Sequence, residues 1–335
     1  MNNFLMKSKD MYFSDRERFG TFKDVFDAIE EVSFTKNYFD ANLFNIEEIL
    51  SILEMQEIVE SGRLKRGFVH YILDVIKHYT PPVRDPENSL GGNWHERLFS
   101  GGHLQPEYGY FVGNLLGLQF EMLLRSPGKP FYKKLPAPST NYSVITLNYD
   151  LVLESYVQYI EQNYSRRQDN KEEKLQFHLG PNPAGVRTRQ VSLAKLHGSV
   201  DTGVVVPPTW NKALNQDLHS SWQLAFKLLA GANHIRIIGY SLPIADAYVK
   251  YLLKAAVIRA PHLKSIDVLC LDNSGEVRER YEQFVKFDNF RFRSDSVVDY
   301  LRRNHRMHIP TDYVPYESQL SMDKLESAHD AFFAP

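Results

Sequence analysis

The sequence predicts an α/β fold, in which a parallel sheet with helices between its strands follows a mainly helical N-terminal portion. Two observations carry this prediction. Over residues 1–125, apolar side chains recur with the 3.6-residue period of helices. Beyond residue 139, short β-branched runs alternate with helical stretches, and the runs are apolar on both faces. Such strands are typical of a parallel sheet that is covered by helices on both sides.

The N-terminal portion contains four apolar stripes with helical spacing. The predicted helices cover residues 22–29, 46–53, 68–79 and 111–124. Pro81 and Pro82 end the third, because a proline ring disfavours helix at the residue before it. Four prolines within residues 126–139 mark a boundary. We therefore expect a mainly helical portion over residues 1–139, an α/β portion over 140–303 and a polar tail over 304–335.

The α/β portion alternates strands with helices. Strands are predicted at 143–147, 191–196, 204–206, 234–238 and 266–271, and helices at 151–160, 222–229, 245–258, 276–284 and 297–301. Arg302, Arg303 and Arg306 form a basic cluster where the polar tail begins. We interpret this cluster as a solvated surface.

Composition excludes several classes of protein. The 335 residues are 43% hydrophobic, enough for a sizeable core, and the net charge of −2 gives no global support for binding nucleic acid or an anionic membrane. The single cysteine, Cys270, excludes a disulfide framework and multi-cysteine zinc sites, and its apolar neighbours indicate an inert core thiol. No apolar run approaches the ~18 residues of a membrane span, and the start lacks a signal-peptide pattern, so we expect a soluble cytoplasmic protein.

Polar residues follow four of the predicted strands, at the edge where α/β sheets bind ligands. They are Asn148 and Asp150; His197 with Gly198; Gly239 and Ser241; and Asp272 with Asn273. Each has a structural alternative. We expect Ser241 to cap the helix that follows, whose positive end favours an anion such as a diphosphate, although a structural turn alone would also explain this segment. Asp150 could simply cap the helix that follows it, a lone histidine is more often structural than catalytic, and Asp272 could simply begin the next helix.

The order of these motifs resembles the prokaryotic sirtuin-like domain family, of the NAD-dependent, non-deacetylase type. The resemblance rests on Asn148-Tyr149-Asp150, residues 195–199, 206–210 and 238–243, and Asp246. Residues 45–48 are also similar to that family's helical insert. The resemblance implies a Rossmann-like sheet with a smaller domain, and NAD between them.

The resemblance also implies roles for single residues. Asn148 and His197 correspond to the catalytic pair, with His197 as the general base at the ribose hydroxyls. Thr146, Asp150, Gly239, Ser241, Asp272 and Asn273 correspond to residues that contact NAD. The chemistry agrees, because cleavage of the nicotinamide–ribose bond develops positive charge that a carboxylate and a positioned amide stabilise. A histidine can accept the proton of the attacking hydroxyl or water.

Two departures from the family pattern guide the functional hypothesis. Deacetylating sirtuins carry a four-cysteine zinc ribbon, and this chain has one cysteine, so we expect no metal site. We therefore favour an NAD glycohydrolase that releases nicotinamide in antiphage defence. The alternatives are a catalytically inactive nucleotide-binding or interaction module and, third, a protein deacylase. A homo-oligomer or a defence-system partner protein stays open.

The second departure concerns the family's Gly-rich strand-to-helix turn, which nothing before Thr146 matches. From this we expect a chain shortened at its amino terminus by on the order of 20–30 residues. We also expect a gap in the sheet between the strands that end at Leu147 and Ile238, and weak NAD binding.

Overall fold

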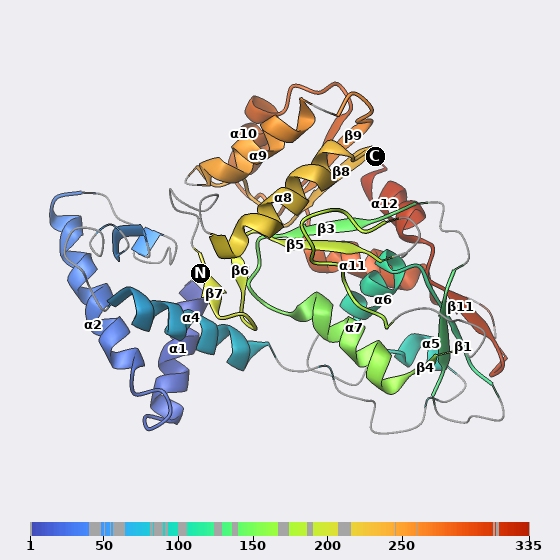
Figure 1. Ribbon diagram of the computed structural model, residues 1–335, viewed down its shortest axis with the longest axis horizontal. Coiled ribbons are helices and arrows are strands. Elements are labelled where there is room, and N and C mark those ends of the chain that lie inside the picture. Colours follow the sequence, from blue (N-terminus) through green and yellow to red (C-terminus); the bar gives the residue numbers. More distant parts are fainter. Residues whose placement is uncertain are drawn as a thin grey trace. The chain divides into compact units, whose positions relative to one another are not determined.

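The chain folds into two compact units, each described here by itself. The computed structural model describes residues 2–39, 48–49, 51–53, 55, 64–80, 83, 90, 93–99, 106–123, 129–135, 140–166, 174–185, 190–206, 216–244, 246–258, 260–310, 312 and 315–334. The helical unit comprises Met1–Thr80, Thr146–Leu151 and Lys195–His219, and the α/β unit comprises the remainder (Figure 1). Residues 81–145 thus group with the α/β unit, whereas the sequence placed the boundary near residue 139.

The helical unit is built from amphipathic helices whose apolar stripes share one core. Its helices are α1 (Asn2–Ser14), α2 (Phe22–Ser33), the 3-10 helix η1 (Phe34–Asn37) and α4 (Leu64–Tyr79). Phe22 and Tyr71 meet edge to face at 4.9 Å, and the Tyr71 hydroxyl lies 2.6 Å from that of Ser8 on α1. The stripes predicted for α2 and α4 are confirmed. Ile49 and Leu53 of the second stripe are buried, whereas Asn45 and Ile46 lie outside the described residues.

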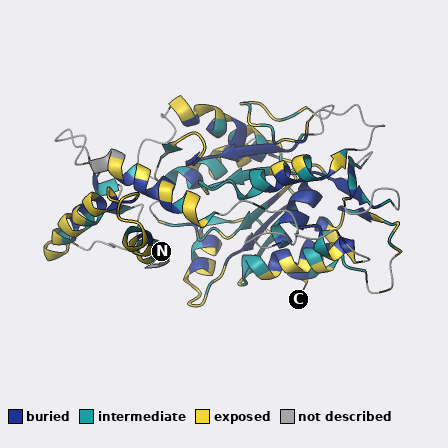
Figure 2. Cartoon of the chain, turned by 90° about the horizontal axis from the view of Figure 1, so that it is seen from below, coloured by how far each residue is buried: buried dark blue, intermediate teal, exposed yellow. Residues whose placement is uncertain are grey.

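The α/β unit contains a three-stranded parallel sheet in the order β10-β9-β8. Its strands are β8 (His234–Ile238), β9 (Ser265–Leu269) and β10 (Phe290–Arg293). On one face, Ile266 and Val268 pack with α9 (Ala247–Val257) and α10 (Glu276–Phe284). On the other, Leu269 packs with α11 (Val297–Arg306) and α12 (Leu325–Phe333). The predicted double-sided burial of the central strand is therefore confirmed, and Figure 2 shows dark, buried strands between helices with one exposed face.

Two further sheets complete the α/β unit. A pair is formed by β3 (Ser143–Thr146) and β5 (Ser192–Lys195), flanked in sequence by α7 (Val152–Asn163) and α8 (Gln216–Ala230). A four-stranded sheet has the order β11-β1-β2-β4. Its strands are Gln319–Ser321, Leu118–Glu121, Phe131–Lys134 and Ser165–Arg166. Within the described residues, no strand joins β3 to β8, and residues 2–14 form α1.

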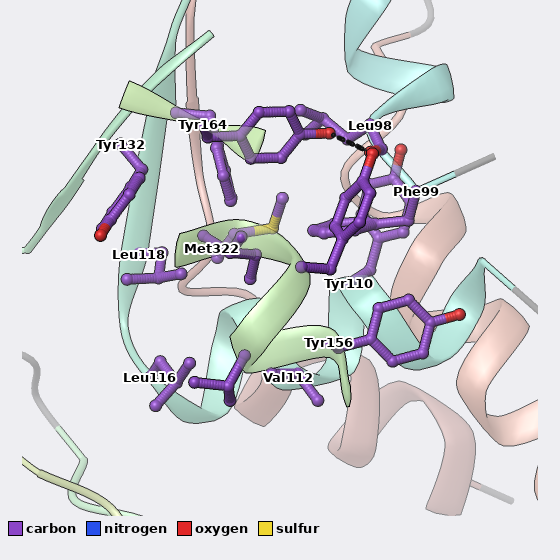
Figure 3. Packing of buried hydrophobic residues seen from close by; sticks show 14 of the residues in the cluster. Leu98, Phe99, Tyr110, Val112, Leu116, Leu118, Tyr132, Tyr156, Tyr164 and Met322 are labelled. Atoms are coloured by element: carbon purple, nitrogen blue, oxygen red, sulfur yellow. Dashed lines mark hydrogen bonds between the residues drawn. The ribbon is translucent and has the colours of Figure 1, made fainter. Parts of the chain in front are cut away.

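The single helix predicted over residues 111–124 is wrong. Helix α6 (Glu107–Leu115) ends at Leu115, and β1 begins at Leu118. Gly117 lies between them with φ of 60°, a left-handed conformation that terminates helices. The apolar run after it is buried in β1, where Leu118 packs among aromatic side chains such as Tyr132 and Tyr164 (Figure 3).

The expected polar tail over residues 304–335 is also wrong. Residues 319–321 form β11, which pairs antiparallel with β1. Residues 325–333 form α12, whose His329 and Phe332 are buried. The segment is polar in its own sequence, so its folding depends on residues that are distant in sequence. No local pattern of residues reveals those partners.

Helix α12 is held to the sheet by a buried ion pair. The Asp267 carboxylate on β9 is 2% exposed and accepts from both Nε and Nη2 of Arg291, at 2.6 and 2.9 Å. It also lies 3.0 Å from Nε2 of His329 on α12. Burial by itself would raise the pKa of Asp267, but the bonds from Arg291 and then His329 outweigh it and hold the pKa well below its usual range. The carboxylate therefore joins β9, β10 and α12.

We expect Asp267→Asn to lower the free energy of unfolding by about 2–4 kcal/mol near neutral pH, because Arg291 and His329 lose their shared anion. Asp330→Asn is the matched control, since that carboxylate is 72% exposed and 3.9 Å from the same guanidinium. It should cost less than about 1 kcal/mol. Urea unfolding of the two variants measures the difference, and equal losses would contradict the assigned role of Asp267.

A second pH-sensitive contact lies between α6 and the end of α11. Nδ1 of His308 donates to the Asn304 carbonyl at 2.8 Å, and Nε2 accepts from the Asn114 amide at 3.2 Å. Burial lowers the pKa of His308 from 6.5 to about 4. A proton on Nε2 would face the amide donor of Asn114, so the folded state holds this histidine neutral.

The unfolded chain therefore binds a proton at His308 where the folded chain does not, and stability falls as the pH drops from 6.5 towards 4. From pH 7 to pH 5 this one group should remove about 2 kcal/mol of folding free energy. His308→Gln should flatten the pH dependence by that amount, whereas the exposed His262→Gln should leave it unchanged. Urea unfolding at the two pH values is the measurement; parallel pH profiles for wild type and His308→Gln would refute the assignment.

Candidate functional site

Polar residues after β3 and β5 form one group, here called the β3–β5 end cluster: Asn148, Asp150, Lys195 and His197. The two loops that carry them lie side by side. The amide of Leu196 donates to the Thr146 carbonyl at 3.0 Å, and the amide of Val200 donates to the Tyr149 carbonyl at 3.0 Å. The whole cluster belongs to the helical unit.

The aromatic ring of Tyr149 lies close to His197. Its centroid is 6.0 Å from that of His197. Tyr149 and Leu151 also pack against Val69 and Leu73 of α4, so the helical unit fixes the loop after β3. Figure 1 shows the short strands that follow His197, β6 (Gly198–Ser199) and β7 (Val204–Val205), beside α4.

His197 is 3% exposed, so its side chain is enclosed, whereas a general base needs access to the proton that it accepts. Its carbonyl accepts from the Val206 amide at 2.9 Å. Gly198 follows it with φ of 98°, as the predicted tight turn requires. The remainder of the 206–210 motif lies outside the described residues.

Asn148 and Asp150 differ in their surroundings. The Asn148 amide donates to Oγ1 of Thr146 at 3.1 Å, so the threonine hydroxyl closes the turn and the Asn148 side chain is exposed. The Asp150 carbonyl accepts from Nζ of Lys195 at 2.5 Å, which brings a cation next to this loop. An exposed amide, a carboxylate, an ammonium and an imidazole are therefore gathered at one end of two adjacent strands.

The remaining predicted residues form the β8–β9 end cluster, within the α/β unit: Gly239, Ser241, Asp272 and Asn273. The carboxyl ends of parallel β8 and β9 bring them to one edge. Gly239 has φ of 75°, and its amide donates to the Leu269 carbonyl at 2.7 Å. A Cβ there would lie 3.1 Å from Cγ2 of Val297, so both the backbone conformation and the space favour glycine.

The prediction that Ser241 caps the following helix is wrong. Helix α9 begins at Ala247, with Asp246 at the N-cap position and no side-chain capping bond. Residues 240–244 instead form a loop that α10 holds in place. The Tyr240 carbonyl accepts from the Tyr281 hydroxyl at 2.7 Å, and the Ser241 carbonyl accepts from Nε of Arg280 at 3.3 Å. These long-range bonds displace the helix start from the serine.

Asp272 has the structural role that was one of the two interpretations the sequence left open. Its carboxylate accepts from the amides of Gly275 and Arg278, each at 2.9 Å, and so supports the start of α10. The Arg278 amide is the main cause of a lowered Asp272 pKa. Asn273 beside it is exposed.

Sequence reasoning missed two cations at this edge. Arg280 contacts the loop through Ser241, as described above, and it pairs with Glu276 at 4.0 Å across one helical turn. The pKa of Lys250 on α9 is lowered chiefly by burial, with Asp246 acting in the opposite direction and Arg280 adding to the lowering. In the sequence, the i, i+4 spacing of Arg280 and Glu276 looks like that of an ordinary surface ion pair. Nothing local therefore indicates that Arg280 contacts the Ser241 loop.

A metal site, a reactive thiol and a membrane span find limited support among the residues that the structure describes. No group of three His, Cys, Asp or Glu side chains there is placed to hold a metal ion. Cys270 is buried, as predicted, and burial raises its pKa. Among the described helices, none has the length and apolarity to cross a bilayer.

Comparison with known families locates both clusters in one matching region. A family model described as SIR2-like domain matches residues 142–291, from just before β3 into β10. No curated protein and no solved structure has detectable similarity to the chain. The matched region includes every predicted site residue, whereas most of the helical unit, α11 and α12 lie outside it. Residues 142–291 are therefore a SIR2-like domain.

Proposed function

We propose that the SIR2-like domain binds NAD and hydrolyses its nicotinamide–ribose bond. The observation that carries this proposal is the β3–β5 end cluster, in which Asn148 and His197 lie on adjacent, hydrogen-bonded loops and the Tyr149 ring is close to His197. Family membership of residues 142–291 supports NAD as the ligand. The polar edge of β8 and β9 supports a dinucleotide, because α/β sheets bind such ligands at the carboxyl ends of their strands.

In the proposed reaction, the bond between nicotinamide nitrogen and the anomeric carbon breaks, and nicotinamide leaves as a neutral base. Water adds to the anomeric carbon and gives up one proton, so the products are nicotinamide, ADP-ribose and a proton. Asn148 orients the water or a ribose hydroxyl through its exposed amide. His197 accepts the proton, and the Asp150 carboxylate stabilises the positive charge that develops on the ribose.

The remaining predicted residues are proposed as NAD contacts by the family resemblance. Thr146 shapes the turn that presents Asn148. Gly239 and Ser241 are proposed at the diphosphate, with Arg280 as an added cation, and Asp272 and Asn273 at the adenosine ribose. By the same family resemblance, we propose NAD depletion in antiphage defence as the biological role.

A second candidate function is a nucleotide-binding module without catalysis. The burial of His197 favours it, because a general base must reach the proton that it accepts. A protein deacylase is less well supported, since the chain has one cysteine and the family's zinc ribbon needs four. Nicotinamide release separates the first two candidates, because both bind NAD and only one cleaves it.

We expect Asn148→Ala and His197→Ala each to lower nicotinamide release by about 100-fold or more, the usual effect of removing a positioned acid–base or orienting group. Asn148 is exposed, so its variant should keep the wild-type unfolding midpoint. His197 is buried, so His197→Gln serves as a second variant of similar polarity. Quantified nicotinamide and the urea midpoint are measured together.

The exposed His262→Ala is the matched control and should release nicotinamide at the wild-type rate. Wild-type turnover in both Asn148→Ala and His197→Ala would refute the catalytic assignment. An NAD-dependent rise in the unfolding temperature of the wild-type chain without any nicotinamide would favour the binding module.

A separate experiment tests the adenosine contact. Asp272→Asn keeps one acceptor oxygen for the start of α10 and loses the bond that the other carboxylate oxygen accepts. It also removes the charge that a ribose hydroxyl would bond. We expect NAD affinity to fall about tenfold, as for a lost hydrogen bond to a charged group, with a small fall in the free energy of unfolding from the lost backbone bond. Unchanged affinity in calorimetry would leave Asp272 with its structural role alone.

A further inference from the structure

A basic hollow lies on the α/β unit, and its lining contains no residue of either strand-end cluster. It has a volume of about 310 Å³ and is lined by Arg293, Arg302, Arg303 and Arg306, with Asp299, Ala331 and Phe332. None of these residues belongs to the proposed NAD contacts, and all lie outside the SIR2-like match. The lining carries four guanidinium groups and one carboxylate.

Three elements that are separate in sequence form this hollow. Asp299, Arg302, Arg303 and Arg306 share one exposed face of α11, at i, i+3, i+4 and i+7. Arg293 comes from the end of β10, and Ala331 and Phe332 come from α12 (Figure 1). The buried residues Tyr300 and Leu301 fix α11 from its inner side, so the arginine face has a rigid base.

The four arginines differ in whether a carboxylate lies close enough to form an ion pair with them. Arg302 pairs with Glu107 at 3.3 Å and with Asp299 at 3.2 Å. Arg293 lies 3.4 Å from Asp295 and 4.5 Å from the centre of the Phe332 ring, which holds it in place. For Arg303 and Arg306, the described residues provide no ion-pair partner. The unbalanced charge is therefore concentrated on the last turn of α11.

A helix C-terminus attracts cations, and this effect alone accounts for Arg303 and Arg306. Arg293 reaches the same hollow from a strand, and its Nη1 donates to the Phe332 and Ala334 carbonyls at the end of α12, which fixes the guanidinium at the hollow. Convergent guanidinium groups are typical of phosphate recognition, because each presents a fork of donors to phosphate oxygens. A hollow of this volume is at the lower end of the range for small-molecule sites and exceeds what one phosphate fills.

We propose that this hollow binds a small molecule with two adjacent phosphate groups, through Arg293, Arg303 and Arg306. Arg302 is balanced by Glu107 and Asp299, and Arg293 by Asp295, so Arg303 and Arg306 carry the two charges without an ion-pair partner among the described residues. Two such charges suit a diphosphate better than a singly charged anion. Phe332 forms an apolar wall beside the anion. The site is independent of the proposed NAD chemistry.

Calorimetric titration of the full chain with inorganic pyrophosphate tests the proposal, at a salt concentration of about 0.15 M. The wild-type chain should bind, and Arg303→Gln with Arg306→Gln should weaken binding by at least tenfold, as expected for lost charge-assisted bonds. Both side chains are exposed, so the double variant should keep the wild-type unfolding midpoint.

The matched control is Arg278→Gln with Lys286→Gln, which removes the same charge from exposed positions of the same unit. It should bind pyrophosphate as the wild type does. An equal loss in both double variants would refute the site and indicate general electrostatic attraction. Absence of pyrophosphate binding by the wild-type chain would also refute it. The proposal is equally refuted if a single-stranded oligonucleotide binds through the same arginines and pyrophosphate does not.

Ser241→Ala separates this proposal from the NAD site. Pyrophosphate affinity should be the same in Ser241→Ala as in the wild type, because Ser241 does not line the hollow. A tenfold loss in Ser241→Ala would place pyrophosphate in the proposed NAD site and overturn the assignment to the hollow. Loss of nicotinamide release in other variants has no bearing on this result.

Discussion

The buried carboxylate of Asp267 is the constraint on which the α/β unit depends most. A charge at 2% exposure is costly unless its lone pairs are filled, and Arg291 and His329 fill them. Because those partners lie on β10 and α12, satisfying one carboxylate also fixes the last strand and the last helix. The Tyr300 hydroxyl lies 3.1 Å from Nδ1 of the same histidine, which adds α11 to the group. One polar network thus positions every element that covers this face of the sheet.

Two kinds of support hold the candidate site residues. The β8–β9 end cluster is fixed by backbone bonds of a parallel ladder and by α10, through Tyr281 and Arg280. The β3–β5 end cluster is fixed by packing of Tyr149 and Leu151 on α4. The helical portion is therefore part of the structure that shapes the proposed catalytic loops, even though the family match begins only at residue 142.

The C-terminal segment gives the α/β unit features that lie outside the SIR2-like match. It provides β11, which pairs with β1, and α12, which covers the parallel sheet and forms one wall of the arginine hollow. A second anchor joins the same helix to β8, where both guanidinium nitrogens of Arg236 bond Glu326 at 2.9 and 2.7 Å. Ion pairs and apolar burial together hold this segment, because Leu320, Met322 and Phe332 are also buried.

The sequence by itself determined the parallel α/β class, the positions of most strands and helices, and the polar residues at four strand ends. These features are local: a period of apolar residues or a polar residue after a strand is visible within ten residues. Glycines at positions 198 and 239 were also readable, because left-handed turns favour that residue.

Only the tertiary structure decided the rest. It showed that residues 304–335 fold, that β1 replaces a helix after Gly117, and that Asp246 rather than Ser241 stands at the start of α9. It also revealed that His197 is enclosed and that Arg293 joins three arginines of α11. Each of these depends on partners more than twenty residues away, such as Arg280 for Ser241 and His329 for Asp267. The free energy of such contacts arises only when distant segments meet, so no local pattern of residues encodes them.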